Sequence, residues 1–202
     1  LDLDVRQRSM SRYLENRARW VRNTGAPLPM PEMVRIDASQ ARDLDSAEAE
    51  EAKHFEDSLK RLSERANYII IDAPPRIAEM TRAIIVMRTL CLVPLGASAA
   101  EIWSTADLIT TINAARDYRD DIDVRIVWNR FRANTREAVE LSEAARSELG
   151  LKELGTRLGY RVAYSEALAR GLAVSEWLDK TAHGEVEALA AEVKRILKEV
   201  GK

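Results

Sequence analysis

The chain of 202 residues contains a single cysteine, Cys91, which lies within an apolar run. One cysteine excludes an internal disulfide, and it excludes a metal or Fe–S site built from several cysteines of one chain. The sequence also has no apolar stretch long enough to cross a membrane and no visible signal peptide. These absences predict a protein of the reducing cytoplasm.

The chain also lacks a large excess of charge of either sign. It carries 31 Lys and Arg residues against 33 Asp and Glu residues, which gives a formal net charge of −2. The molecule as a whole is therefore not a polycation. Any contact with nucleic acid would have to come from a local basic patch.

The most informative segment is NYIIIDAPP, at residues 67–75. Its apolar run, residues 68–71, does not alternate with polar residues, which predicts a strand buried on both faces as in a parallel sheet covered by helices. Asp72 would then lie at the carboxyl end of that strand, where open α/β sheets bind ligands. The simpler interpretation is a core strand followed by a turn aspartate, since Asp before Pro is common in turns.

Strand-like and helix-like segments alternate along the rest of the chain. This alternation predicts an α/β fold with a doubly wound, mostly parallel sheet flanked by helices, in a single domain spanning residues 1–202. We expect Trp103 on the apolar face of its helix and Thr135 as a helix cap. The predicted strands are residues 33–36, 68–71, 89–95, 122–128 and 153–160, and the predicted helices are residues 9–22, 51–66, 77–87, 99–118, 135–149, 165–170 and 185–200.

Five segments together resemble the ParA/MinD family of deviant Walker ATPases. They read LDLDVRQRSMSRYLENR, YIIIDAPP, LCLVPLGAS, VRIVWNRF and YRVAYSEALARGLAVSEW, in that order. The opening segment is most similar to the MipZ branch, whereas the middle and end read more like plasmid or chromosome partition ATPases. The resemblance covers nearly the whole chain, and it implies an ATP-dependent switch that uses Mg²⁺.

The glycine-rich phosphate-binding loop of that family is not in the sequence. The only Gly-Lys pair is Gly201-Lys202, and no G-x-x-x-x-G-K-[ST] motif occurs. Because Leu1–Asp4 reads as the end of a strand, we expect the first βα unit to lie upstream of this numbering. The alternative is a relative that truly lacks the loop and acts as a non-catalytic interaction module.

Three aspartates match the family's catalytic and metal positions. Asp4 corresponds to the carboxylate that positions or activates the attacking water, and Asp2 to a residue that supports the magnesium shell. Asp72 corresponds to the Walker B aspartate, which holds Mg²⁺ through its water ligands. The alternative for Asp4 is a solvated acid at a strand end.

Two further segments match the family's adenine-binding positions. The resemblance places Asn129 and Arg130 against the base, and Arg161 and Val162 over its other side. An ordinary strand-to-loop junction is an equally good interpretation of Asn129 and Arg130.

Family members dimerise with ATP and bind DNA non-specifically through surface arginines and lysines. The corresponding candidates are Arg132, Arg136, Arg157 and Arg170, although a solvated basic rim is the commoner meaning of such a cluster. The last helix has an aliphatic stripe without Trp or Phe, which favours core packing over membrane binding. An Fe–S relative is disfavoured because Cys91 is alone.

The resemblance therefore implies a cytoplasmic, nucleoid-associated ATPase that forms a homodimer with ATP. Its expected partners are non-specific DNA and a ParB-like or division protein, with no membrane. Its expected role is plasmid or chromosome segregation, or placement of the division site.

Overall fold

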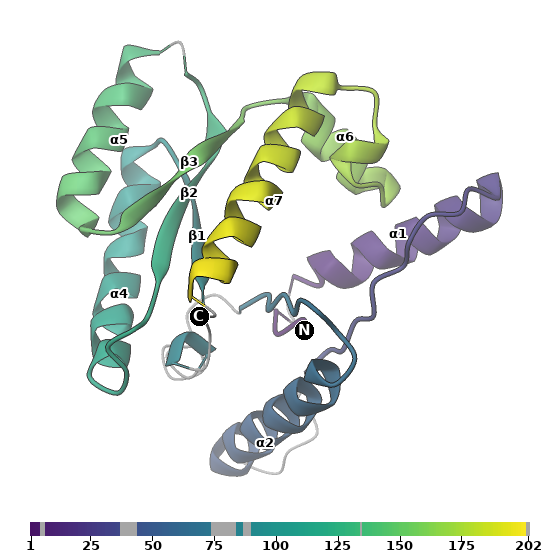
Figure 1. Cartoon of the computed structure of the whole chain (residues 1–202), viewed down its shortest axis with the longest axis horizontal. Helices are drawn as coiled ribbons and strands as arrows, with labels where there is room; N and C mark the ends of the chain where they lie inside the picture. Colours follow the sequence, from purple (N-terminus) through teal and green to yellow (C-terminus); the bar gives the residue numbers. More distant parts are fainter. Residues whose placement is uncertain (5–6, 37–43, 74–83, 87–89, 134, 201–202) are drawn as a thin grey trace. The chain divides into compact units, whose positions relative to one another are not determined.

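The structure is a computed structural model that describes residues 1–4, 7–36, 44–73, 84–86, 90–133 and 135–200. It contains two compact units, Leu1–Thr81 and Arg82–Lys202. Figure 1 shows their elements in the colours of the sequence. The predicted helix at residues 77–87 falls largely outside the described residues; residues 84–86 are helical.

The first unit is built on a short parallel ladder of three chain segments. Asp2 forms parallel bridges with Arg35 on one side and Asp72 on the other. Backbone hydrogen bonds extend this pairing, from the Asp2 N–H to the Val34 carbonyl at 2.9 Å and from the Leu3 N–H to the Asp72 carbonyl at 3.0 Å. Residues 1–3 thus lie in the middle of the ladder, and the two aspartates lie side by side.

Two amphipathic helices belong to this unit. Helix α1, Ser9–Thr24, ends at Gly25, whose φ of 68° is a left-handed conformation that glycine adopts readily. Helix α2, Leu44–Ser63, buries Phe55 and Leu62 on one stripe, as its apolar spacing predicts. Residues 25–31 are not helical, which agrees with their proline content.

The sequence predicts that residues 68–71 form a strand buried on both faces, and the predicted burial is wrong. Tyr68 is 56% exposed and Ile70 is 76% exposed. Ladder pairing is limited to residues 70–72, where the Leu1 carbonyl accepts from the Asp72 N–H at 2.9 Å. An unalternating apolar run favours a strand, but it does not determine whether anything covers the second face.

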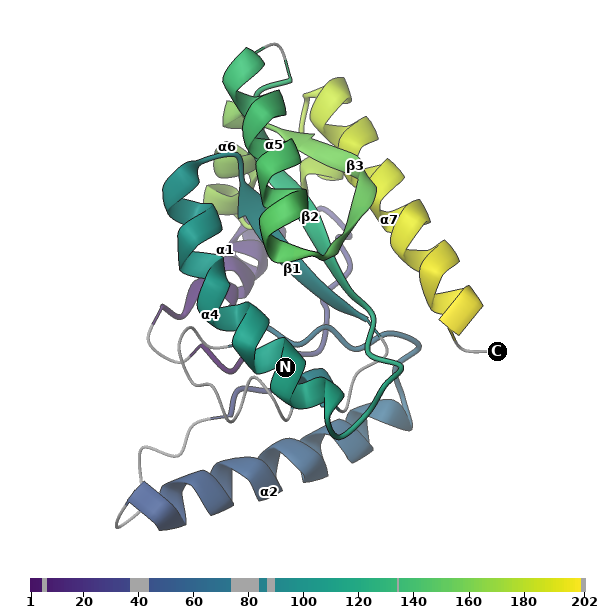
Figure 2. The ribbon, with the colours of Figure 1, turned by 90° about the vertical axis from the view of Figure 1, so that its left-hand side faces the viewer.

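The second unit contains a three-stranded, wholly parallel sheet in the order β1-β2-β3. The strands are β1 at Cys91–Gly96, β2 at Val124–Phe131 and β3 at Lys152–Gly159. Helices α4 (Ala99–Arg116) and α5 (Arg136–Leu149) lie on one face, and α7 (Lys180–Val200) lies on the other (Figure 1, Figure 2). Helix α6 (Val162–Arg170) and the 3-10 helix η1 (Val174–Glu176) connect β3 to α7.

The core of this unit occupies both faces of the sheet. Ile126 and Trp128 of β2 pack in the cluster on the α4 and α5 side, with Ile112 of α4. Val127, between them, packs with Leu154 of β3 and Ile196 of α7. Burial on both faces explains why the middle of β2, residues 126–128, is an unbroken apolar run, and it confirms the predicted doubly wound α/β fold and the core role of the last helix.

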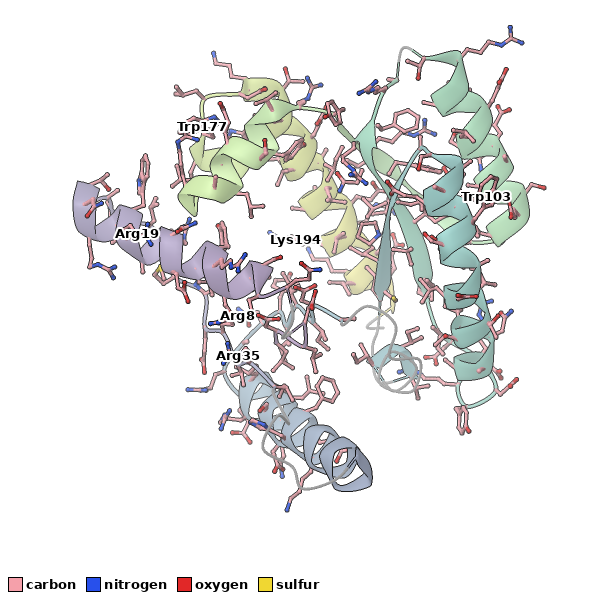
Figure 3. The ribbon with its side chains drawn as sticks, turned by 180° about the vertical axis from the view of Figure 1, so that it is seen from behind. Arg8, Arg19, Arg35, Trp103, Trp177 and Lys194 are labelled. Carbon is pink, nitrogen blue, oxygen red and sulfur yellow. The ribbon has the colours of Figure 1, made fainter. Side chains whose placement is uncertain are left out.

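Several predicted positions shift in the structure. Trp103 is 66% exposed rather than part of the α4 core, because the buried stripe runs through Ile102, Thr105 and Ile112 instead (Figure 3). Strand β2 continues to Phe131, so Asn129 and Arg130 lie within the strand and not after it. Helix α6 begins at Val162, three residues earlier than predicted.

Candidate functional site

The ladder of the first unit brings Asp2, Asp4 and Asp72 together. Asp2 is only 1% exposed, and its two carboxylate oxygens accept from the Asp4 N–H at 3.1 Å and from the Ser11 hydroxyl at 3.2 Å. Asp4 accepts the Gln7 N–H at 3.2 Å, next to the start of α1. Asp2 is therefore held by internal hydrogen bonds, whereas Asp4 is half-buried at the end of the ladder.

The negative charges of this cluster act on Asp72. Burial raises the pKa of the Asp72 carboxyl above its usual value, and the charges of Asp2 and Asp4 raise that pKa further. A cation placed beside Asp72 would reverse this effect. Within the described residues, no group of three His, Cys, Asp or Glu side chains is arranged to hold a metal directly. These carboxylates suit a hydrated cation better than an ion enclosed by protein ligands.

The second unit has a cavity of about 260 Å³ at the carboxyl ends of β1 and β2. Ser98 and Thr135, which cap α4 and α5 by accepting the N–H of the residue three positions on, both line it. The N-terminal ends of two helices therefore open on this cavity. This is the edge of a parallel sheet at which α/β proteins bind ligands.

Glu101 organises one wall of this first cavity. Its carboxylate accepts the Gly96 N–H at 2.6 Å and is paired with the Arg130 guanidinium. A Cβ on Gly96 would lie 2.7 Å from the Glu101 carboxylate oxygens, so a larger residue at the end of β1 would displace this carboxylate. The sequence analysis missed Glu101, although the Ser98-x-x-Glu101 spacing is that of a helix-capping pattern.

Arg130 lines the first cavity in an unusual backbone conformation. Its φ of 51° is left-handed, and it coincides with an irregularity in the β2–β3 pairing between Trp128 and Phe131. A non-glycine residue in this region carries a strain of about 1 kcal/mol or more, and such strain concentrates at functional sites. The neighbouring Asn129 side chain accepts the Arg130 N–H at 2.9 Å and does not line the cavity.

A second cavity of about 470 Å³ adjoins the end of β3. Arg132 and Tyr160 line both cavities, and the Arg132 guanidinium lies 4.7 Å from the centre of the Tyr160 ring. Arg157 lies 4.5 Å from the centre of the Phe131 ring on the wall of the second cavity. Tyr160 is a second residue that the sequence analysis missed, because an aromatic side chain before a helix carries no distinctive signal.

The structure separates the two predicted residues of the α6 entrance. Arg161 lines the second cavity, but its guanidinium is bound to Glu185 through Nε at 3.0 Å and Nη2 at 2.7 Å. Val162 is exposed and lines neither cavity. Tyr160 and Arg132, rather than the Arg161 and Val162 side chains, present a flat stacked surface there.

The remaining predicted arginines lie apart from these cavities. Arg136, at the start of α5, has a side chain that is 92% exposed and pairs with Glu140 at 2.7 Å. Arg170 lies 4.5 Å from the centre of the Trp177 ring at the end of α6. The structure therefore does not gather the four predicted DNA-binding arginines around one point.

Two predicted absences can be compared with the structure. Burial raises the pKa of the Cys91 thiol to about 11, so this side chain stays protonated and is a poor metal ligand. Among the described helices, none has the length and apolar composition that a membrane span requires.

Residues 1–118 match the family described as ATPase MipZ. The solved structure of Cyanthece apo McdA matches 67% of this chain with a TM-score of 0.57 and 20% sequence identity. The chain spans 56% of the length of that structure, and the likeness supports the fold alone. No curated protein matches in sequence.

The MipZ match covers more than half of the chain, including all three aspartates of the ladder. It agrees with the resemblance of the opening segment and with the parallel α/β fold. The chain therefore belongs to the family described as ATPase MipZ.

Proposed function

We propose that this protein is an ATP-dependent and Mg²⁺-dependent positioning switch. The observation that carries the proposal is the carboxylate cluster, in which Asp2 and Asp4 raise the pKa of Asp72 at the carboxyl end of a parallel ladder. Accumulated negative charge of this kind is stabilised by a hydrated divalent cation. When bound, Mg²⁺ would neutralise charge on the nucleotide phosphates.

Each aspartate has a distinct role in this proposal. Asp72 would hold a hydrated cation through its water ligands, and Asp2 holds the ladder and the Asp4 backbone in place. Asp4 orients the attacking water and accepts its proton. Phosphoryl transfer depends mainly on positioning and charge stabilisation, so one oriented carboxylate near the water is sufficient.

The cavities of the second unit are the proposed site of the adenine base. Tyr160 and Arg132 offer a flat surface on which a heteroaromatic ring can stack, and Arg130 offers donors to ring nitrogens. Arg161 shapes this wall through Glu185. Asn129 supports the Arg130 backbone.

The decisive experiment measures binding of a fluorescent ATP analogue to the full-length protein while Mg²⁺ is titrated. We expect binding that strengthens with Mg²⁺ in the wild type and loses most of this dependence in Asp72→Asn. Wild-type protein that binds no nucleotide would overturn the proposal and favour a non-catalytic interaction module of the same fold.

We further propose that the ATP-bound protein forms a homodimer that binds DNA non-specifically, with release controlled by a ParB-like or division partner. Two sets of arginines are candidates. Those of the second unit already have neighbours, as for Arg136 with Glu140. Helix α1 and the residue that precedes it, by contrast, carry four exposed arginines, and none of them forms an ion pair with a residue that the structure describes: Arg8, Arg12, Arg19 and Arg22. Figure 3 labels two of them, Arg8 and Arg19.

The two sets can be separated by salt dependence. Each phosphate contact contributes about 0.9 to the slope of log affinity against log salt concentration on duplex DNA. We expect Arg12→Ala with Arg19→Ala to lower the slope by about 2, and Arg132→Ala with Arg136→Ala to lower it less. Fluorescence anisotropy with a non-hydrolysable nucleotide measures both. If both double variants kept the wild-type slope, DNA binding through either set of arginines would be contradicted.

A further inference from the structure

Glu185 is the most connected side chain beside the second cavity. It lies in the second turn of α7, and its carboxylate accepts from the Gly159 N–H at 3.0 Å, from Arg161 and from the Tyr164 hydroxyl at 2.8 Å. These donors come from the end of β3, from the loop after it and from the first turn of α6. One carboxylate therefore ties three consecutive parts of the chain to α7.

The contact with β3 is close because a glycine lies at its end. A Cβ on Gly159 would lie 3.1 Å from a Glu185 carboxylate oxygen and 3.2 Å from the Arg161 Nε. Any larger residue at this position would push the carboxylate away from the backbone. The absence of a side chain at Gly159 therefore allows the Glu185 carboxylate to approach the end of β3 closely.

The segment between these contacts carries Tyr160. The Tyr160 N–H donates to the Phe131 carbonyl at 3.1 Å, which attaches this residue to β2. Glu185 holds the residues on both sides of it, Gly159 and Arg161. Tyr160 is itself 60% exposed, so its ring is placed by these backbone neighbours and by the Arg132 guanidinium rather than by burial in a core.

We propose that Glu185 is a positioning residue for nucleotide binding. By holding Gly159, Arg161 and Tyr164, it places the Tyr160 ring against Arg132, so that the stacking surface exists before the ligand arrives. This inference rests on the proposed placement of the base beside Tyr160. A preformed surface does not have to become ordered when the ligand binds. The free-energy cost of that ordering is avoided, and the affinity is therefore higher.

Helix α7 provides a matched control in Glu192, two turns further on. Its carboxylate accepts the Gly155 N–H at 2.8 Å and the Thr156 N–H at 2.9 Å, so it also ties α7 to the backbone of β3. Glu192 is not among the residues that line either cavity. The two glutamates therefore share a structural contact and differ in their relation to the candidate site.

The test compares Glu185→Ala, Glu185→Gln and Glu192→Ala in the full-length protein. We expect Glu185→Ala to raise the KM for ATP about tenfold, a loss of about 1.4 kcal/mol in binding, with kcat at saturating ATP within about twofold. Glu185→Gln keeps an acceptor for the Gly159 N–H and should recover part of the affinity. Glu192→Ala should leave KM unchanged although it also weakens the α7–β3 contact.

A second readout does not depend on ATP. Amide hydrogen exchange over residues 159–164 should accelerate in Glu185→Ala and stay unchanged in Glu192→Ala. If exchange is faster in Glu185→Ala but the wild-type protein binds no nucleotide, Glu185 would keep its structural role. That result would overturn both the proposed function and the role of Glu185 in nucleotide binding. Unchanged exchange, or an equal rise in KM in both alanine variants, would overturn the positioning role alone.

Discussion

The carboxylates of the two units have opposite electrostatic surroundings. In the first unit, Asp72 faces Asp2 and Asp4, and its pKa is raised by burial and by these negative neighbours. In the second unit, burial alone would raise the pKa of Glu185, but hydrogen bonds from Arg161, the Gly159 N–H and Tyr164 lower it below its usual value. The same holds for Glu192, where the N–H groups of Gly155 and Thr156 overcome the effect of burial.

This difference distinguishes a ligand-binding site from a structural clamp. By a clamp we mean a carboxylate such as Glu185 or Glu192, whose hydrogen bonds join α7 to the backbone of β3. Donors that already surround Glu185 and Glu192 leave little for a ligand to add, so these carboxylates stabilise the fold. The aspartate cluster has unfavourable charge that a ligand can relieve, and proteins retain such arrangements where function requires them. The comparison predicts opposite responses to removing the charge in the two units.

The largest expected effect concerns Asp4. Asp4→Asn keeps an oxygen that can accept the Gln7 N–H but removes the base, whereas Asp4→Ala removes both. We expect both variants to lose ATP hydrolysis by at least about 100-fold, with nucleotide binding retained. Steady-state hydrolysis and fluorescent nucleotide binding measure the two properties. Only Asp4→Ala should also lower the unfolding free energy, by about 1 kcal/mol. Wild-type hydrolysis in Asp4→Asn would show that Asp4 belongs with the clamps.

An intermediate effect is expected at the clamps themselves. Glu185→Ala and Glu192→Ala should each lower the unfolding free energy by about 2 kcal/mol at neutral pH, because charge-assisted hydrogen bonds to the β3 backbone are lost. Denaturant unfolding measures the difference. Because the folded pKa of each glutamate lies below its unfolded value of 4.5, this stabilisation is present above pH 4.5 and disappears as the pH falls through the folded pKa. If the difference in unfolding free energy between wild type and variant did not change as the pH falls, packing rather than charge would hold α7 on β3.

The smallest effect, with the opposite sign, is expected at Asp72. Its folded pKa lies above the unfolded value of 3.8, so the ionised carboxylate destabilises the fold as the pH rises through that window. Asp72→Asn should therefore raise the Tm in Mg²⁺-free buffer at neutral pH, by about 1–2 °C, and the difference should vanish below pH 3.8. Thermal unfolding with and without Mg²⁺ and nucleotide measures it. A lower Tm in the variant would place Asp72 with the stabilising carboxylates instead.

Much of the second unit could be predicted because its signals are local. The capping oxygen of Thr135, the end of α6 at Gly171 and the short apolar run at residues 126–128 of β2 each depend on neighbours within a few residues. Periodicity and capping preferences act at that range, so helix and strand positions follow from sequence to within a few residues. The three aspartates could be selected because they follow apolar segments and match a family motif. Their roles remain proposals.

Other features depended on which distant residues meet. The exposure of Ile70 and Trp103 depends on what covers one face of a segment, and no pattern within the segment contains that information. Arg161 could be selected as a candidate from its family motif, but its hydrogen bonds to Glu185 join residues 24 positions apart and hold its guanidinium there. The left-handed turn at Arg130 likewise arises where β2 and β3 lose register. Sequence by itself determined the elements and the charges they carry, whereas the tertiary structure decided which charges are paired, because pairing depends on distances that only the folded chain sets.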